Sequence, residues 1–401
     1  MEIFLLIILI LIVIDITKYL VRYFRVCRIF NKTSKENIKI NTYKKLSIII
    51  PAMNEVNHVE ASLDYFSKLS DYCNVYYVTT AKEKSKATYY TLQKLIANKG
   101  ITNCFVYNSP NTEGTMATQL NYMAEKLNKE AIIGIYNIDS FPKVESLIYI
   151  LNNIKEGEVY QQVSYFDDEL NGPISSAQNW QNRWSLIYEM AKYSKKSGGL
   201  NFVYTIGHGM FIYKSDLDKY GYWSDKEINE DNEMGFRLLT NKVQIKNVPY
   251  LERAEFAKNM KIYIKQQSTW FNGPLYAFSY YKKLPKEKKN FSSLLLACLN
   301  FKAAVSWLLY PLLFLFVAIA FLFVDPIFAL VTLSLEIFYV SFLNLLCKRL
   351  LIKYGYIKNK STTNFIYDIY FFFCHCLGPF KTIGKLIKKQ NTISNKYNTE
   401  K

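Results

Sequence analysis

Long apolar runs occupy both ends of the chain, and the middle alternates short apolar runs with longer amphipathic ones. The first run covers residues 3–16, and runs 303–324 and 327–346 near the other end each reach the ~20 residues that span a bilayer. The polar pair Asp325-Pro326 separates the two later runs, as expected of a tight turn between helices. The pattern therefore predicts one N-terminal membrane anchor and a C-terminal transmembrane hairpin.

A further apolar run at 365–380 is shorter and carries Asp368 and His375. Lysines flank it on both sides, which a spanning helix does not favour. We expect an interfacial or re-entrant helix here, with a fourth span as the alternative. For the run 3–16 the alternative is a cleaved signal peptide, but basic residues follow this run instead of preceding it, so we expect a retained anchor.

Strands and helices alternate in the middle of the chain. Strand-like runs cover 46–50, 74–79, 103–107 and 131–136, and helix-like stretches begin near Glu55 and end near Asn98. Such alternation is typical of the α/β class, with a mostly parallel sheet flanked by helices. We divide the chain into an anchor at 1–20, a basic juxtamembrane linker at 21–45, an α/β domain at 46–290, the hairpin at 291–348, and an interfacial or re-entrant helix with a basic tail at 349–401.

Basic residues exceed acidic ones, 50 against 33, for a formal net charge of +17. They gather beside the apolar segments, directly after the first run and at 282–289 and 381–389. Because basic residues near short segments stay on the cytosolic side, this placement predicts a multi-pass protein of the cytoplasmic (inner) membrane, with the α/β domain in the cytosol and the lipid bilayer as a partner. We expect no nucleic-acid binding, since no nucleic-acid-binding motif accompanies the charge.

The seven cysteines include no CxxC pair, and we expect reduced thiols. Cys374-His375-Cys376 combines metal-binding residue types, but adjacent residues on a helix point in different directions and no second ligand pair follows. We therefore predict no metal site there.

Four short polar signatures stand between the apolar ends, and they carry the candidate chemistry. In chain order they are Pro51-Ala52-Met53-Asn54-Glu55, Asn137-Ile138-Asp139-Ser140, Glu230-Asp231 and Gln266-Gln267-Ser268-Thr269-Trp270. Each carboxylate follows a strand-like run or begins a helix-like one, where an open α/β sheet places its ligands. In order and spacing the signatures resemble the inverting family-2 glycosyltransferases with a GT-A fold, and specifically the membrane-bound, synthase-like branch. The resemblance covers the chain from about Leu46 to Gly273.

The resemblance implies a divalent cation, Mg²⁺ or Mn²⁺, at the motif that follows the fourth strand. Asp139 occupies the last position of the family's Asp-x-Asp metal motif and is the expected metal ligand. Asn137 stands at the first position, where it adds no charge, and we expect it on the donor side of the site. The alternative for this signature is an ordinary turn or helix cap before Pro142.

Glu230-Asp231 matches the family's catalytic pair, in which the aspartate is the general base. The resemblance therefore implies that Asp231 takes the acceptor's proton, with Glu230 beside it as a like charge that raises basicity where both are poorly solvated. The alternative is a helix N-terminus, where carboxylates favour the dipole. Gly207-His208-Gly209 resembles the small-residue turn under the donor sugar, which implies donor binding, and for His208 a structural role stays open.

The last signature matches the family's Gln-x-x-Arg-Trp motif at Gln266 and Trp270, and the resemblance implies that both bind the acceptor. Thr269 replaces the arginine that pairs with the donor pyrophosphate in the family. Lys265 or Arg253 could supply this charge, or the enzyme is not processive. For Trp270, a core or membrane-interface position is the alternative.

The nucleotide end departs further from the family pattern. Pro51 and Glu55 match the first loop and are expected to bind the donor, but Thr79-Thr80 replaces the second-strand aspartate and the segment 114–121 lacks the family's lysine. The base is therefore poorly constrained, with a UDP-sugar favoured as donor. The stretch 180–193, rich in Trp and Tyr, resembles the segment that such enzymes lay against the membrane interface, and a buried core helix is the alternative.

We therefore expect an inverting, metal-dependent membrane glycosyltransferase. It would move a sugar from a nucleotide-diphosphate donor to a glycan or polyprenyl-linked acceptor in cell-surface polysaccharide synthesis. One alternative is a non-processive transferase that makes a short lipid-linked intermediate. Another is a degenerate, inactive subunit that scaffolds polysaccharide export, which the replacements at Asn137, Thr79 and Thr269 keep open.

Overall fold

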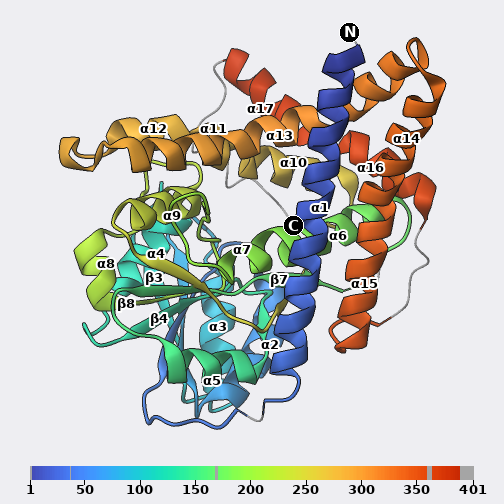
Figure 1. Cartoon of the computed structure of the whole chain (residues 1–401). Coiled ribbons are helices and arrows are strands. Elements are labelled where there is room, and N and C mark those ends of the chain that lie inside the picture. Colours follow the sequence, from blue (N-terminus) through green and yellow to red (C-terminus); the bar gives the residue numbers. More distant parts are fainter. Residues whose placement is uncertain (1, 37, 168–169, 359–363, 389–401) are drawn as a thin grey trace.

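The computed structural model describes residues 2–36, 38–167, 170–358 and 364–388. Its main sheet has seven strands in the order β3-β2-β1-β4-β8-β6-β9 (Figure 1). The strands are β1 (Leu46–Pro51), β2 (Cys73–Thr80), β3 (Cys104–Ser109), β4 (Ile132–Ile135), β6 (Glu158–Gln161), β8 (Met210–Tyr213) and β9 (Gln244–Asn247). β8 is antiparallel to both neighbours, and all other neighbours are parallel. The predicted α/β class with a mostly parallel sheet is confirmed.

The central strands form where the sequence is continuously apolar. Ile48, Ile49 and Ile50 in β1 are fully buried, as is typical of a parallel strand covered on both faces. β4 packs closely beside β1 because Gly134 has no side chain, and a Cβ there would lie 2.6 Å from Cδ1 of Ile48. The Cβ would also meet the ring of Phe211 on β8. A larger residue at this glycine would therefore force the centre of the sheet apart.

Helices follow most strands of the main sheet, as expected for this class. They are α2 (Val56–Phe66), α3 (Ala87–Asn98), α4 (Met116–Ala124), α5 (Val144–Asn153), α8 (Lys214–Tyr220) and α9 (Glu230–Thr240), with a 3-10 turn η1 (Ser67–Leu69). A second sheet has the order β5-β10-β7 and is formed by β5 (Phe141–Pro142), β10 (Glu252–Ala254) and β7 (Ser164–Phe166). This small sheet begins shortly after the end of β4, which brings it to the edge where the polar signatures lie.

A layer of helices lies over this part of the sheet domain (Figure 1). Its members are α6 (Pro173–Arg183), the π-helix η2 (Trp184–Met190), α7 (Ala191–Tyr193), α10 (Met260–Trp270), α11 (Asn272–Leu275), α12 (Ala277–Lys283), the 3-10 turn η3 (Lys286–Lys288) and α13 (Phe291–Leu322). α13 contacts α9, α11 and α12 near its start, and Val317 and Phe321 near its end join a buried cluster with α1 and α14. One helix therefore links the sheet domain to the apolar ends of the chain.

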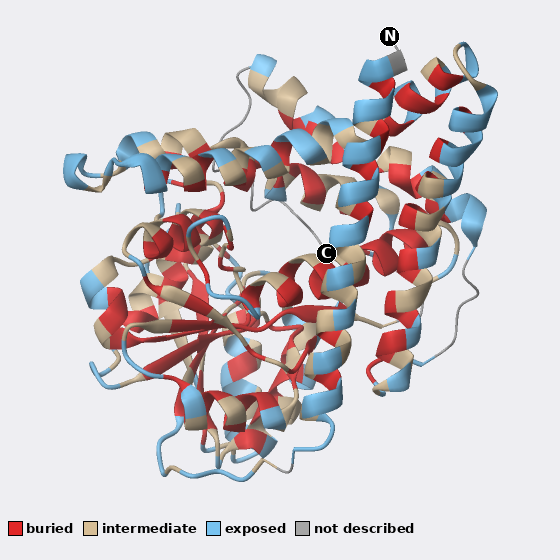
Figure 2. Cartoon of the chain, viewed as in Figure 1, coloured by how far each residue is buried: buried red, intermediate tan, exposed pale blue. Residues whose placement is uncertain are grey.

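Three described helices are long and apolar enough to cross a membrane: Ile3–Thr33, Phe291–Leu322 and Pro326–Lys353. The third comprises α14 (Pro326–Ile337), η4 (Phe338–Phe342) and α15 (Leu343–Lys353). Asp325 begins this helix, because its side chain accepts a hydrogen bond of 2.8 Å from the backbone N–H of Ile327. Exposed apolar side chains on these helices give the protein a surface suited to lipid (Figure 2). Length and composition thus point to membrane association.

α1 (Glu2–Thr33) is longer than the predicted anchor. No glycine or proline interrupts it, and packing holds its second half in place. Val26 and Phe30 are buried, and the Phe30 ring lies 5.1 Å from that of Tyr354 and 5.5 Å from that of Tyr356. The linker predicted at 21–45 therefore begins only after Thr33.

The run predicted at 365–380 forms two short helices, α16 (Phe365–Cys374) and α17 (Leu377–Ile387). Neither belongs to the helices long enough to span. α17 packs against α10, where the Thr382 hydroxyl donates to the carbonyl of Ser268 and a Cβ on Gly378 would clash with Gln267. An interfacial position for this segment stays a prediction.

Candidate active site

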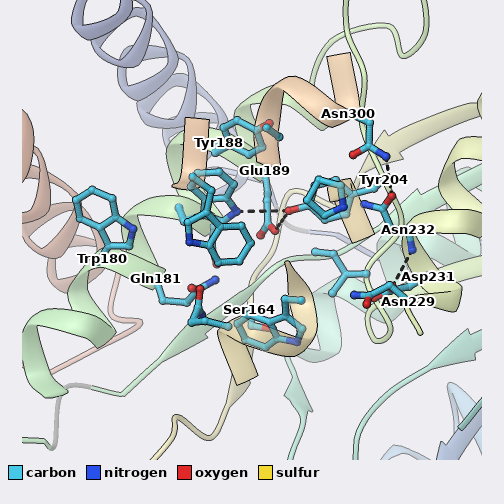
Figure 3. Close-up of a pocket in the computed structure, with 18 of the residues that line it drawn as sticks. Ser164, Trp180, Gln181, Tyr188, Glu189, Tyr204, Asn229, Asp231, Asn232 and Asn300 are labelled. Atoms are coloured by element: carbon cyan, nitrogen blue, oxygen red, sulfur yellow. Dashed lines mark hydrogen bonds between the residues drawn. The ribbon is translucent and has the colours of Figure 1, made fainter. Parts of the chain in front are cut away.

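A cavity of about 150 Å³ lies where the small sheet and its loops meet the helical layer (Figure 3). One side carries polar residues from the sheet domain: Ser164, His208, Asn229, Asp231 and Asn232. The other side carries mostly aromatic residues: Trp180, Trp184, Tyr188, Tyr204, Trp270 and Trp307. We call these the sheet wall and the aromatic wall.

Asp231 lines the cavity near the start of α9. Its Oδ2 accepts a hydrogen bond of 3.0 Å from the backbone N–H of Gly207, and its Oδ1 accepts one of 2.7 Å from that of Asn232. The Thr205 hydroxyl donates to the Asp231 carbonyl at 2.6 Å. The carboxylate is therefore fixed from both sides, and the geometry suits the base role predicted for Asp231.

Glu230 precedes Asp231 but does not share its surroundings. It is buried as the first residue of α9 and is not among the residues that line the cavity. Successive residues on a helix point about 100° apart, which separates the two carboxylates. A catalytic role for Glu230 stays a prediction, and the geometry favours Asp231 of the pair.

His208 joins the cavity to a buried carboxylate. Its Nδ1 is hydrogen-bonded to Glu252 of β10, whose Oε1 also accepts a bond of 2.8 Å from the Ser164 hydroxyl. Burial lowers the pKa of His208, but attraction to Glu252, and more weakly to Asp139 and Glu189, outweighs this and leaves the pKa raised. The imidazole is therefore biased toward its cationic form, beside the cavity.

The two glycines on either side of His208 differ in how strictly the structure requires glycine. Gly209 has φ +66°, and a Cβ there would lie 2.7 Å from the carbonyl oxygen of Gln162, so this position needs glycine. Gly207 is less crowded, and its Cβ would make ordinary contacts with Met116 and with Oδ2 of Asp231. The turn thus brings the backbone N–H of Gly207 to Asp231. Donor contacts for these residues stay predictions.

The predicted metal motif follows β4 directly. Asn137 is half-buried and its carbonyl accepts from the backbone N–H of Ser140, which makes the turn, while Asp139 is buried at 2% exposure. Asp139 lies near enough to His208 to raise its pKa. Among the described residues, no group of three or more His, Cys, Asp and Glu side chains is arranged to hold a metal ion. A cation here would need ligands from the donor.

The predicted donor residues of the first loop lie outside the cavity lining. Pro51 ends β1, paired with Val78, and Glu55 begins α2. The loop is held by Glu83, a buried residue that the sequence did not single out. Its Oε2 accepts from the backbone N–H of Asn54 at 3.2 Å, and its Oε1 accepts from the Thr88 hydroxyl at 3.0 Å. A carboxylate thus stands three residues after Thr80, but it links the first loop to the first turn of α3.

The aromatic wall is built largely by η2 and the end of α6. Trp184 stacks on Tyr188 with ring centroids 3.9 Å apart. The Tyr204 hydroxyl donates to Oε1 of Glu189 at 2.6 Å, a pair that faces the cavity in Figure 3. Burial raises the pKa of Glu189. Trp184, Tyr188 and Glu189 of this stretch line the cavity, and π-helices are frequent at functional sites. A position of the stretch at the membrane interface stays a prediction.

The last signature contributes through one face of α10. Trp270 lines the cavity at 40% exposure, and the buried Gln267, three residues earlier, lines it too. Gln266 is half-buried outside the lining. The Thr269 hydroxyl donates back to the carbonyl of Lys265. Arg253, considered as a replacement charge, pairs with Asp167 at 3.2 Å. Acceptor binding by Gln266 and Trp270 stays a prediction, and the geometry favours Trp270.

Several buried polar atoms around the cavity have no hydrogen-bond partner within the described residues: Nε2 of Gln267, Oδ1 of Asn229, Nε1 of Trp180 and Nδ1 of His375. Burial, together with the nearby Arg183, lowers the pKa of His375 to about 3, so this imidazole is neutral. Its neighbours Cys374 and Cys376 are free thiols. Such atoms are left for a ligand or water to satisfy.

Sequence reasoning therefore found part of the site and missed part. It singled out Asp231, His208 and Trp270, which share the cavity, and noted the aromatic stretch 180–193 without assigning it to the site. It missed Glu189 and Glu252. Glu189 lies inside that stretch and was the only carboxylate in it, which is a usable signal, whereas Glu252 has no distinctive sequence context.

Comparisons with known proteins bear on the family and the fold of the chain. The sequence profile of the family described as Glycosyl transferase family group 2 matches residues 135–347, more than half of the chain. The mannosyltransferase PcManGT from Pyrobaculum calidifontis, in complex with GDP-Man and Mn2+, has a similar fold at 12% identity and a TM-score of 0.55, covering 94% of this chain and 99% of that one. S. aureus TarS 1-349 is also similar, at 14% identity and a TM-score of 0.45, covering 87% and 92%. No curated protein sequence matches the chain.

Proposed function

Because the chain belongs to glycosyl transferase family group 2, we propose that it transfers a sugar, with inversion, from a nucleotide-diphosphate donor to an acceptor held in the cavity. One observation carries this proposal. The Asp231 carboxylate stands in the sheet wall with each oxygen held by a backbone N–H group, facing a space lined by aromatic rings. A general base must be fixed in this way within reach of the proton that it takes.

Asp231 performs the proton transfer in this mechanism. The acceptor hydroxyl donates its proton to the carboxylate while its oxygen attacks the anomeric carbon from the side opposite the diphosphate, which inverts that carbon. The rings of Trp270 and Trp184 supply flat apolar faces for the sugar rings. The cationic tendency of His208 places positive charge beside the site, where the departing diphosphate gains negative charge.

The residues after β4 fit a divalent cation, Mg²⁺ or Mn²⁺. Mg²⁺ is usually held by one or two carboxylates together with substrate phosphates, so the buried carboxylate of Asp139 and the amide of Asn137 are a sufficient protein contribution. When bound, the cation neutralises charge on the diphosphate leaving group. The Mn2+ and GDP-Man in the PcManGT complex support a metal and a nucleotide sugar here. A UDP-sugar remains our predicted donor.

The acceptor is a short or lipid-linked one in this proposal. The cavity volume of about 150 Å³ is small, since ligand pockets usually measure about 300–1,000 Å³. This favours the non-processive alternative over a synthase that threads a long polymer. We further propose that the sheet domain faces the cytosol, where nucleotide sugars occur, with basic residues of α1 and 282–289 on that side of the cytoplasmic membrane.

The test uses the full-length protein in detergent with a panel of nucleotide sugars and short prenyl-phosphate or oligosaccharide acceptors, with Mg²⁺, Mn²⁺ or excess chelator. We expect one donor to be consumed with transfer of its sugar, inversion at the anomeric carbon, and loss of activity in Asp231→Asn. Retention of configuration would contradict the mechanism, and full activity in chelator would contradict the metal. No transfer from any donor, with unchanged nucleotide binding in Asp139→Ala, would favour the inactive-subunit alternative.

A further inference from the structure

A second pocket lies outside the active site, beside the middle of α1. It measures about 500 Å³ and shares no residue with the cavity. Its lining residues form two adjacent rows along α1 at i, i+4 spacing, with one residue from the loop after α7: Val13, Thr17, Val21 and Arg25; Ile14, Lys18 and Arg22; and Lys195. We call this pocket the basic groove.

The composition of the basic groove changes along the helix. Val13 and Ile14 form its apolar end, inside the most hydrophobic part of α1, and both are exposed. Lys18 lies one turn further, followed by Arg22 and Arg25. The groove therefore runs from apolar to cationic where a membrane-spanning α1 would pass from hydrocarbon to headgroups.

The cations of the groove are crowded and poorly neutralised. Lys18 pairs with Asp15 at 3.7 Å, but no other ion pair in the described part of the chain involves Arg22, Arg25 or Lys195. Repulsion by Arg25, with smaller contributions from burial and from Arg22, lowers the pKa of Lys195. Like charges held this close gain most from an anion placed between them.

Tyr188 separates the basic groove from the active site. The Arg22 guanidinium lies 5.5 Å from the centroid of the Tyr188 ring, and Trp184 stacks on Tyr188 with 3.9 Å between centroids. Trp184 and Tyr188 line the cavity, whereas Arg22 lines the groove. An anion in the groove would thus lie near the cavity without entering it, which argues against the reacting substrate as its occupant.

We propose that the basic groove binds an anionic glycerophospholipid, with the phosphate between Arg22, Arg25 and Lys195 and an acyl chain along Val13 and Ile14. This site is independent of the proposed transfer reaction. The apolar end would bury a chain that inorganic phosphate lacks, and the cationic end would discriminate against a zwitterionic headgroup. The occupant is a resident lipid of the bilayer, not the acceptor.

The test measures anisotropy of tail-labelled phosphatidylglycerol binding to the full-length protein in neutral detergent. We expect Arg25→Gln with Lys195→Gln to weaken binding by about tenfold or more, since each cation near an anionic surface contributes measurably. The matched control is Arg28→Gln with Lys196→Gln, which removes the same charges from the same helix and loop but outside the groove. The control should bind within about twofold of the wild type. Phosphatidylcholine and inorganic phosphate should not compete.

Arg25 also donates to the carbonyl of Ala191 at 3.1 Å, so a second pair, Lys18→Gln with Lys195→Gln, tests the groove without breaking that bond. It should weaken binding as well, while the thermal unfolding of the lipid-free protein stays close to the wild-type value. If the groove variants and the control variant lost the same amount of lipid binding, the effect would come from the overall charge of the protein, and the proposed site would be wrong. If inorganic phosphate competed as strongly as phosphatidylglycerol, the groove would be a phosphate site and not a lipid site. If a prenyl phosphate bound more tightly, the occupant would be an acceptor-type lipid and not a glycerophospholipid.

Discussion

The two walls of the cavity differ in how their main polar groups are held. In the sheet wall, Asp231 is held by two backbone N–H groups, and His208 is held by Glu252. Toward the helical layer, Nε2 of Gln267 and Nε1 of Trp180 are buried without a hydrogen-bond partner among the described residues. The charged groups of the sheet wall are therefore held by the protein itself, although Oδ1 of Asn229 in this wall also lacks a partner among the described residues, whereas the helical side leaves two polar atoms open.

This contrast distinguishes groups that the protein holds in place before the reaction from groups that form hydrogen bonds only when a ligand binds. A preorganised carboxylate costs no rearrangement when the reaction begins. Buried polar atoms without partners each cost free energy until something bonds to them, and a hydroxyl-rich acceptor can do so. We therefore assign the chemistry to the sheet wall and the choice of acceptor to the aromatic wall, and each prediction below tests that division.

The largest effect should come from Asp231→Asn. The amide cannot take the acceptor's proton, and its NH₂ group would face a backbone N–H in place of an oxygen. We expect turnover to fall by about 10²–10⁴-fold, with donor binding largely intact, as measured by initial rates and by equilibrium binding of the donor.

Glu230→Gln is the control for that variant, because Glu230 is adjacent in sequence but outside the cavity lining. Its loss of turnover should be much smaller. If Glu230→Gln lost as much turnover as Asp231→Asn, both carboxylates would take part in the proton transfer, and Asp231 alone would not be the base.

The next effect concerns the stability of the sheet wall. Gly209→Ala places a side chain at φ +66° and 2.7 Å from the Gln162 carbonyl oxygen. A left-handed residue with a Cβ costs roughly 1–2 kcal/mol, and the clash adds to this, so the midpoint of thermal unfolding should fall. Gly207→Ala, with nearest contacts of 3.4 and 3.5 Å, should unfold near the wild-type temperature. Equal midpoints for the two variants would show that the turn adapts.

The same division explains what the sequence could predict. Strands such as β1 and β4 are continuous apolar segments, and Asp139 and Asp231 follow or begin regular elements, so local pattern is enough to find them. The resemblance to a family then gives them roles. The motifs that carry Asp139 and Asp231 are therefore local, whereas Glu252, which holds His208 from 44 positions away in the sequence, is not.

The aromatic wall is not local, because α6, η2, α10 and α13 come together only through packing. The sequence placed the acceptor role on Gln266, but which face of α10 meets the cavity depends on α17, where Gly378 allows close approach to Gln267. The extension of α1 to Thr33 likewise depends on Phe30 meeting Tyr354 and Tyr356. Contacts between residues this distant in sequence leave no short motif.

A moderate effect should follow from Trp270→Ala in the aromatic wall. The ring is 40% exposed, so its loss should cost little stability. Stacking on an aromatic face contributes roughly 0.5–1.5 kcal/mol, which predicts an acceptor KM raised by up to about tenfold with the donor KM unchanged. Tyr43→Ala, at a fully exposed tyrosine, is the control and should change neither constant. A change in the donor KM instead would show that Trp270 contacts the donor and not the acceptor.

The smallest effect is a pH dependence that comes from the pairing of His208 with Glu252. The pKa of His208 is raised in the folded protein, although burial alone would lower it, because the carboxylates of Glu252 and its neighbours favour the cation. The stabilisation is therefore fully present below the unfolded-state pKa of about 6.5 and is lost as pH rises through the raised folded-state value.

In Glu252→Gln the main attraction is gone, so the thermal midpoint of the wild type should exceed that of the variant most at low pH, and the gap should narrow as pH rises. Glu158→Gln provides the comparison, since its partner Lys246 stays charged over this range and the gap should be flat. A gap for Glu252→Gln that is equally flat would mean that Glu252 does not favour the cationic form of His208, and the sheet wall would then lose its cation.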